Sequence, residues 1–158
     1  MSDLSWISKD LLRELTAQAQ AAPRKRKNHN IHVGDAAPCQ RLLNAVEPES
    51  YIPPHCHRDP GKEETLLLLS GRVGIVFFDD QGAITGDAVL DANALRFGVT
   101  IAPGTFHTLV ALTSGTVFFE AKAGPYAPLS ADERASWAPV EGDPASTAYL
   151  AMLKRRFA

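Results

Sequence analysis

The chain has 158 residues, of which 45% are hydrophobic and 22% are charged, and its formal net charge is −2. This length and composition fit one globular domain with a sizeable core. The small net charge gives no bulk reason to expect binding to nucleic acid, so we expect no nucleic-acid partner. No apolar run approaches the length of a membrane span, and the N-terminus lacks a long apolar segment. We therefore expect no membrane partner and a cytoplasmic location.

The first part of the chain predicts a short helix over residues 8–22. Leu11 and Leu15 recur at helical spacing, Ser8 suits the N-cap, and Pro23 suits the end of the helix. We expect this helix to pack on the outside of a larger unit. A polar segment follows it.

Between residues 39 and 123, short apolar runs alternate with turn signals, and Asp79-Asp80-Gln81-Gly82 is a turn of the hairpin kind. Many short strands at such spacing are typical of all-β sandwiches and closed barrels. We predict strands over residues 39–46, 64–70, 72–78, 83–90, 98–102, 106–112 and 116–123.

The tail is rich in proline at first and then predicts a second helix over residues 147–157, with Leu150 and Leu153 on its apolar side. We expect three parts in one all-β fold. They are an N-terminal helix with a polar extended segment that packs on a β-barrel, the barrel itself, and a C-terminal extension with a short helix. Their bounds are 1–38, 39–126 and 127–158.

Four side chains in two glycine-marked segments suggest a metal site. His55 and His57 form an H-x-H pair, and because side chains alternate along a strand, both imidazoles would lie on one face. Glu64 and His107 sit in neighbouring apolar runs. Histidine and carboxylate side chains hold divalent metal ions. Cys56 lies between the two histidines and would face the other way, so we predict that it is a packed residue.

The segment PHCHRDPGKEETLLLLSG resembles the first cupin motif, and GVTIAPGTFHTLVAL resembles the second. The resemblance implies a jelly-roll β-barrel and a ligand set of His55, His57, Glu64 and His107. Glu64 is preferred to Glu63 because six residues separate it from the closing glycine of the motif. Six residues also separate His57 from Glu64, where three or four are usual in the family. The ligand set suits one divalent ion, either Fe, Mn, Ni or Zn, and leaves one or two coordination positions open.

More of the chain resembles the WbuC-type cupin metalloproteins, which are associated with bacterial O-antigen and polysaccharide gene clusters. This resemblance rests on RKRKNHNIH, CQRLLNAVEPESYIPPHCH, EAKAGPY and WAPVEG, at residues 24–32, 39–57, 120–126 and 137–142. It implies a metal-binding cupin and leaves the reaction unnamed. The wider cupin resemblance also implies a homodimer.

Alternate residues of the polar segment form a second group, namely Arg24, Arg26, Asn28, Asn30 and His32. In an extended segment all five would share one face. Arginine and asparagine could then bind an anionic, hydroxyl-rich ligand, with His32 as an acid–base or orienting group. The alternative is a solvated basic connector between helix and barrel.

Glu120 and Lys122 form a third group on one face of a predicted strand. They could contact a ligand, or they could be an exposed ion pair of small energetic value. Asn44 and Arg41 lie on opposite faces of their strand, and we expect Asn44 to face inward.

Two functions fit these residues. The first is a metal-dependent isomerase, epimerase, lyase or oxygenase that acts on a small anionic or sugar-derived substrate. In it, Arg24, Arg26 and Asn30 would hold the anion, and His32 or Glu120 would move the proton. The second is a non-catalytic cupin that is stabilised by its metal and binds or senses a sugar nucleotide.

Overall fold

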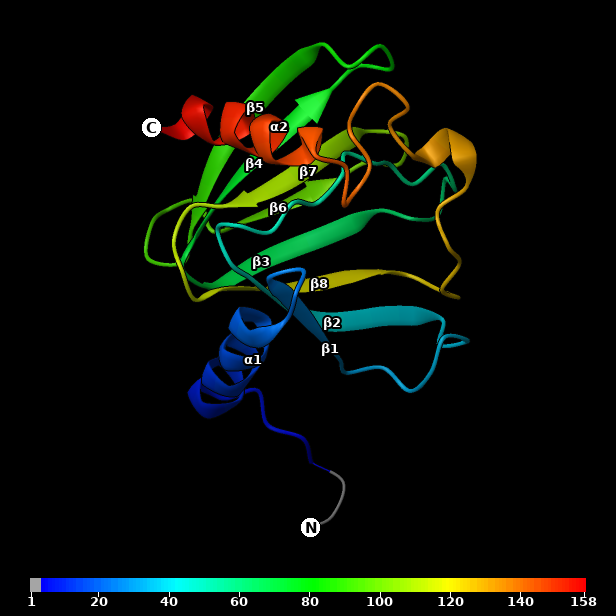
Figure 1. Cartoon of the computed structure of the whole chain (residues 1–158). Helices are drawn as coiled ribbons and strands as arrows, with labels where there is room; N and C mark the ends of the chain where they lie inside the picture. The colour runs from blue at the N-terminus through cyan, green and yellow to red at the C-terminus, as the bar shows by residue number, and fades with distance from the viewer. Residues whose placement is uncertain (1–3) are drawn as a thin grey trace.

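Two antiparallel sheets and two helices make up the computed structural model, which describes residues 4–158 (Figure 1). The five-stranded sheet has the order β1-β2-β8-β3-β6. Its strands are β1 (Arg26–Asn30), β2 (Cys39–Val46), β8 (Thr116–Ala123), β3 (Glu64–Ser70) and β6 (Gly98–Ile101). The three-stranded sheet has the order β5-β4-β7, with strands β5 (Ile84–Asp91), β4 (Arg72–Phe78) and β7 (Phe106–Ala111). The strand ladders of the described residues do not join the two sheets into one closed barrel.

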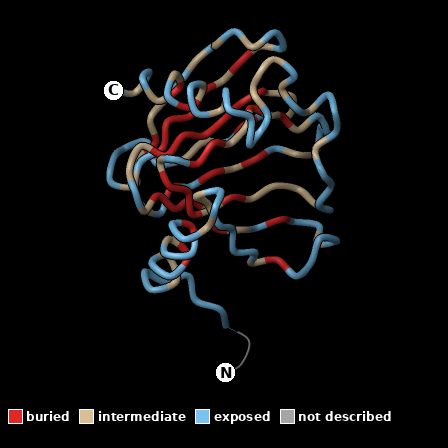
Figure 2. The backbone as a smooth tube through the Cα atoms, in the orientation of Figure 1, coloured by how far each residue is buried: buried red, intermediate tan, exposed pale blue. Residues whose placement is uncertain are grey.

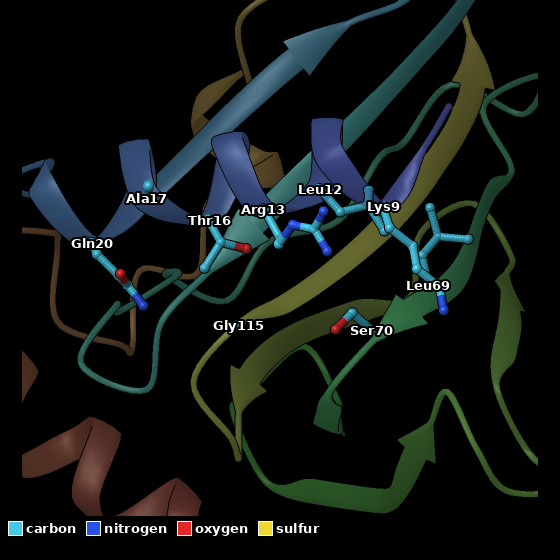
Figure 3. Close-up of a pocket in the computed structure, with 9 residues that line it drawn as sticks. All are labelled: Lys9, Leu12, Arg13, Thr16, Ala17, Gln20, Leu69, Ser70 and Gly115. Carbon is cyan, nitrogen blue, oxygen red and sulfur yellow. The ribbon is translucent and has the colours of Figure 1, made fainter. Parts of the chain in front are cut away.

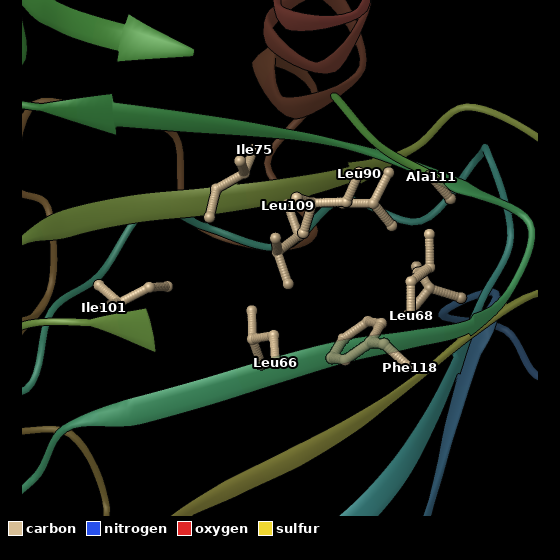
Figure 4. Packing of buried hydrophobic residues seen from close by; sticks show 10 residues of the cluster. Leu66, Leu68, Ile75, Leu90, Ile101, Leu109, Ala111 and Phe118 are labelled. Carbon is tan, nitrogen blue, oxygen red and sulfur yellow. The ribbon is translucent and has the colours of Figure 1, made fainter. Parts of the chain in front are cut away.

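The inner faces of the two sheets pack against each other and form the main core. Leu66 and Phe118 of the larger sheet point toward Ile75 and Leu109 of the smaller one (Figure 4). Figure 2 shows that buried positions follow the strands of both sheets. Each such leucine or phenylalanine contributes about 1.5–3 kcal/mol on full burial, so this core holds the sheets together.

Helix α1 (Lys9–Ala21) covers part of the outer face of the five-stranded sheet. The Ser8 side chain accepts a hydrogen bond from the backbone N–H of Leu11 at 3.2 Å, which confirms Ser8 as the N-cap. Leu15 and Ala19 are buried in a cluster with Leu43, Ala45 and Val117. The predicted outer position of this helix is therefore confirmed.

Four strands have the bounds that the sequence predicts, β6 and β7 differ by one residue at one end, and β5 is shifted by one residue at both ends. The Asp79 carboxylate accepts hydrogen bonds from the backbone N–H groups of Gln81 and Ala83, and Gly82 has a φ of 88°. This turn joins β4 to β5, as its Asp/Gly composition predicts.

The C-terminal segment includes a short 3₁₀ turn at Ala131–Glu133 and then α2 (Ala145–Lys154), which covers the three-stranded sheet (Figure 1). Helix α2 begins two residues earlier than predicted, and Arg155–Phe157 form a 3₁₀ turn instead of α-helix. A Cβ atom at Gly74 would lie 2.3 Å from the Phe157 ring, so glycine allows this ring to approach β4. Among residues 4–158, no helix is long and apolar enough to cross a bilayer.

Candidate metal centre

The two predicted metal-binding segments meet at one end of the fold. His55 forms an isolated antiparallel bridge with His107, and their backbones exchange hydrogen bonds of 3.0 and 2.9 Å. One ligand atom each from His55, His57 and Glu64 lies within 4.8 Å of the others. The Nε2 atom of His107 lies 3.2 Å from Oε2 of Glu64, and Nε2 of His57 lies 3.7 Å from the same oxygen. Glu64 therefore lies beside all three imidazoles.

Backbone carbonyls fix the orientation of two imidazoles. Nδ1 of His55 lies 3.0 Å from the carbonyl oxygen of Pro53, and Nδ1 of His107 lies 3.0 Å from that of Thr105. A carbonyl can only accept, so each Nδ1 carries a proton, and in a neutral ring this leaves the lone pair at Nε2 for a ligand. Such an outer hydrogen bond is typical of histidines that bind a metal.

Two buried polar atoms in this cluster lack hydrogen-bond partners within residues 4–158. Nε2 of His57 and Oε2 of Glu64 are buried and have no hydrogen-bond partner among the described residues. A buried carboxylate oxygen and a buried imidazole nitrogen without partners are unfavourable unless another group, such as a cation, satisfies them. The donor set therefore fits a divalent metal ion.

The charge states also suit a metal ligand set. Burial, with the neighbouring His107 second, lowers the pKa of His55 to about 4, so this ring is neutral near pH 7. Burial likewise lowers the pKa of His57. Burial acts to raise the pKa of Glu64, but its contact with His107 and the ammonium group of Lys122 hold that pKa well below its usual range. Metal binding requires neutral imidazole and ionised carboxylate.

Lys122 and Glu120 lie next to Glu64 on the inner face of the five-stranded sheet. Lys122 pairs directly with Glu64 across β8 and β3, and its Nζ donates to Oε1 of Glu64 at 3.4 Å and to Oε1 of Glu120 at 2.5 Å. Asn44 donates to Oε2 of Glu120 at 2.8 Å, which shows that Asn44 faces inward. Burial, together with the charge of Glu64, raises the pKa of Glu120 to about 7. Glu120 is buried and the Lys122 side chain is only 20% exposed, so the interpretation as an exposed ion pair is wrong.

The polar segment before β2 is divided by its backbone. Lys25 has a φ of 55°, and after Asn30 the Arg41 carbonyl accepts from the N–H groups of both Ile31 and His32. The prediction of one continuous extended face from residue 24 to residue 32 is therefore wrong at both ends. Only residues Arg26–Asn30 form a strand.

The residues of this segment line two different cavities. Asn28, Asn30, His32 and Lys122 line one of about 250 Å³, in which Asn28 donates to Asn30 at 2.9 Å. Nδ1 of His32 contacts the backbone oxygen and nitrogen of Arg41 at 2.8 and 3.0 Å, so its ring is held by the backbone. His32 does not line the cavity that contains His57.

The cavity that contains His57, the metal pocket, has a volume of about 240 Å³. Its polar lining residues are His55, His57, Gln40, Lys62, Lys122 and Tyr126. Sequence reasoning missed Gln40, Lys62 and Tyr126. Gln40 could have been found, because it pairs with Lys122 in the same row that contains Glu64.

A third cavity, the arginine pocket, has a volume of about 440 Å³ and contains Arg24 and Arg26. Both pair with Glu141 of the C-terminal segment. His55 and Leu129 line both this pocket and the metal pocket, so the two are neighbours. Sequence reasoning missed Glu141 because its partners lie more than a hundred residues away.

A groove on the outer side of the five-stranded sheet has a different character. It has a volume of about 370 Å³, and Figure 3 shows Leu12, Arg13 and Thr16 of α1 on one side with Leu69 and Ser70 on the other. It contains none of the predicted site residues. Its side chains offer no group of metal ligands.

Comparison with known proteins places the chain in a family. The family model described as "Domain of unknown function (DUF6016)" matches residues 7–90, which include His55, His57 and Glu64. The chain belongs to this family. The family description names no activity, and a search of curated proteins found no match.

Solved structures with a similar fold include KdgF from Halomonas sp., with a TM-score of 0.52 and 12% identity over 80% of this chain and 94% of that one. Oxalate oxidase in complex with the substrate analogue glycolate matches with a TM-score of 0.54 and 14% identity, over 88% of this chain and 75% of that one. CapF, bound to an inhibitor, has a TM-score of 0.54 and 22% identity, and 30% of its length is covered by 68% of this chain. These are cupin-fold proteins, so the likeness supports the cupin fold.

Proposed function

We propose that this protein is a metal-binding cupin that holds one divalent ion, Fe, Mn, Ni or Zn, through the side chains of His55, His57, Glu64 and His107. The observation that carries the proposal is the pair of buried polar atoms that have no hydrogen-bond partner among residues 4–158, Nε2 of His57 and Oε2 of Glu64. A bound cation would satisfy both. When bound, such an ion supplies Lewis acidity to a small molecule in its open position.

The residues around the centre support a small anionic or sugar-derived substrate. The metal pocket of about 240 Å³ is of a size for a small molecule, and Lys62 and Lys122 bring positive charge to its lining. Gln40 and Tyr126 add hydrogen-bonding groups. Among the solved structures of the same fold, oxalate oxidase binds the small carboxylate glycolate. We infer chemistry of the isomerase, epimerase, lyase or oxygenase type.

One observation favours the alternative of a non-catalytic protein that binds or senses a sugar nucleotide. Both predicted acid–base groups are engaged within the protein, since Glu120 contacts Lys122 and Asn44, and His32 contacts the backbone of Arg41. A general base must reach the proton that it removes. Turnover of a substrate by the metal-loaded protein would exclude this alternative, and saturable binding without product would favour it.

Four further expectations stay predictions that rest on resemblance or on the sequence alone. They are the WbuC type with its link to bacterial polysaccharide metabolism, the homodimer, the cytoplasmic location, and the division of the chain at residues 38 and 126.

The decisive test is elemental analysis of protein that was purified without a histidine tag. We expect near one equivalent of a single metal in the wild type and its loss in His57→Ala and Glu64→Gln. His29→Ala is the matched control, because His29 is exposed on β1 and should leave the metal content unchanged. The proposal fails if the wild type takes up none of the four metals on reconstitution, or if the ligand variants keep the metal.

A further inference from the structure

The arginine pocket carries an excess of positive charge. Arg24, Arg26 and Arg134 contribute three guanidinium groups, and Glu141 contributes one carboxylate. Nε and Nη2 of Arg134 donate to the backbone carbonyl of Leu129 at 3.2 and 3.0 Å. No carboxylate of residues 4–158 forms an ion pair with Arg134. The pocket can therefore accept another anion.

The remaining walls of the pocket are largely apolar. They are formed by two segments that lie far apart in the sequence, and their apolar side chains include Ile52, Pro53, Leu129, Ala135, Pro139 and Val140. Ligand sites commonly combine such walls with a few convergent polar groups. The lining thus fits an anionic head with an apolar body.

The Glu141 carboxylate marks the position of the anionic head. Arg24 donates to its two oxygens at 2.8 and 2.6 Å, and Arg26 donates to it at 2.9 Å. Two guanidinium groups around one carboxylate form the arrangement that planar oxyanions prefer. The same geometry would hold the carboxylate or phosphate of a ligand.

The Arg26 side chain, which would bind the anion, is held in place by contacts other than those with Glu141. Arg26 also donates to the Ser50 hydroxyl at 3.1 Å and to the Tyr51 carbonyl at 2.9 Å. The Ser50 hydroxyl in turn donates to the Arg24 carbonyl at 2.8 Å. These contacts keep Arg26 in position when Glu141 leaves, so little ordering is needed on ligand binding.

Glu141, which occupies the proposed position of the anionic head, is weakly held. Glu141 lies in an exposed turn, next to Gly142 with a φ of 86°, and its side chain is 32% exposed. The segment is anchored by another contact, because the Tyr51 hydroxyl donates to the Pro139 carbonyl at 2.8 Å. Partly exposed ion pairs contribute little to stability, so Glu141 can swing out without unfolding its segment.

We propose that the arginine pocket is a second ligand site, which binds a small organic anion with an apolar body and an oxyanion head that displaces the Glu141 carboxylate from Arg24 and Arg26. The Glu141 carboxylate therefore competes with the ligand for Arg24 and Arg26. The site goes beyond the proposed metal function. His55 and Leu129 line both this site and the metal pocket, so the two sites are neighbours.

The test is a titration followed by nuclear magnetic resonance, with benzoate and phenyl phosphate as probes and benzamide as the neutral control. The two anions distinguish a carboxylate from a phosphate preference. We expect both to bind the wild type and benzamide not to bind. Glu141→Gln should tighten anion binding about two- to fivefold, the change expected when one partly exposed competing ion pair is lost. Arg26→Met should weaken it at least about tenfold, because it removes charge-assisted hydrogen bonds.

Two control variants locate the site. Arg72→Met removes another partly exposed arginine, one that pairs with Asp91 on β5, and should leave binding unchanged. His57→Ala should also bind the anions as the wild type does, which separates this site from the metal centre. Failure of metal uptake would not affect this result.

Three results would overturn the proposal. The first is that neither the wild type nor folded Glu141→Gln binds the anions, which would leave Glu141 as a structural link of the C-terminal segment. The second is that benzamide binds as benzoate does. The third is that Arg24→Met, whose exposed side chain can be removed without loss of folding, binds the anions unchanged.

Discussion

Replacement of Lys122 by methionine should destabilise the metal-free protein by about 2–3 kcal/mol. Its ammonium group is the cation between two buried carboxylates, at 2.5 Å from Glu120 and 3.4 Å from Glu64. Removing one partner of a fully buried ion pair costs about 3–5 kcal/mol, and we lower this figure because the Lys122 side chain is 20% exposed. Methionine keeps the apolar stem, so the loss reports the missing charge and not a cavity.

The assay is urea unfolding at pH 8 with a chelator present, because this pH lies above the pKa of about 7 that Glu120 has in the wild type. Adding Glu120→Gln to Lys122→Met should restore more than half of the loss, because one of the two uncompensated carboxylates is gone. Lys27→Met, on the exposed outer face of β1, is the matched control and should change stability by less than about 0.5 kcal/mol. Equal stability of Lys122→Met and wild type, or additive losses in the double variant, would refute the reasoning.

Other parts of the fold give further predictions. The N–H of Arg58 and other donors lower the pKa of Glu133 to about 2, so this group stabilises the fold above about pH 4.5 and its contribution is lost as the pH falls toward 2. Because Glu133 is largely accessible to solvent, the wild type should lose only about 1 kcal/mol of stability over this pH range. Urea unfolding of Glu133→Gln at the same pH values should not show this loss of stability. Gly74→Ala should destabilise the protein by about 1–2 kcal/mol in thermal or urea unfolding, and less in a Phe157→Ala background, because the added methyl group displaces that ring. Ser8→Ala should lose about 1 kcal/mol of stability with its N-cap, and an unchanged unfolding midpoint would contradict that role.

The sequence could predict most strands because the signals are local. Short apolar runs, the glycine at residue 71 and the Asp79 turn predict β3 and β4 at their observed bounds. The H-x-H pair also follows from local geometry, since alternation places His55 and His57 on one face. A hydrogen-bond bridge from His55 to His107 then brings the second segment to the same place.

The arginine pocket could not be predicted in the same way. Arg24 and Arg26 alternate with Lys25, so an extended backbone would aim both at the metal face with Asn28 and Asn30. The left-handed conformation of Lys25 interrupts that run, and no glycine signals it. The partner Glu141 comes from a segment whose position depends on packing of α2 and not on any local pattern.

The inner face of the five-stranded sheet explains why a polar cluster persists inside this fold. Successive cross-strand rows pair Glu64 with Lys122, Leu66 with Glu120, and Leu68 with Phe118. The rows therefore change from polar to apolar along β3. The apolar end supplies the core, while the polar end buries groups that oppose folding unless a ligand satisfies them.

This division gives a prediction on His57, whose Nε2 is buried without a hydrogen-bond partner among the described residues. An unsatisfied buried acceptor costs about 1–3 kcal/mol, and the His57 side chain is only 11% exposed. His57→Leu should therefore raise the stability of the chelator-treated protein by about 1 kcal/mol in urea unfolding while it abolishes metal uptake. His29→Leu, at an exposed position, is the control for added hydrophobicity alone. A loss of stability in His57→Leu would mean that this imidazole serves the fold and not a ligand. A gain would show that the chain keeps a destabilising residue where its metal is proposed to bind.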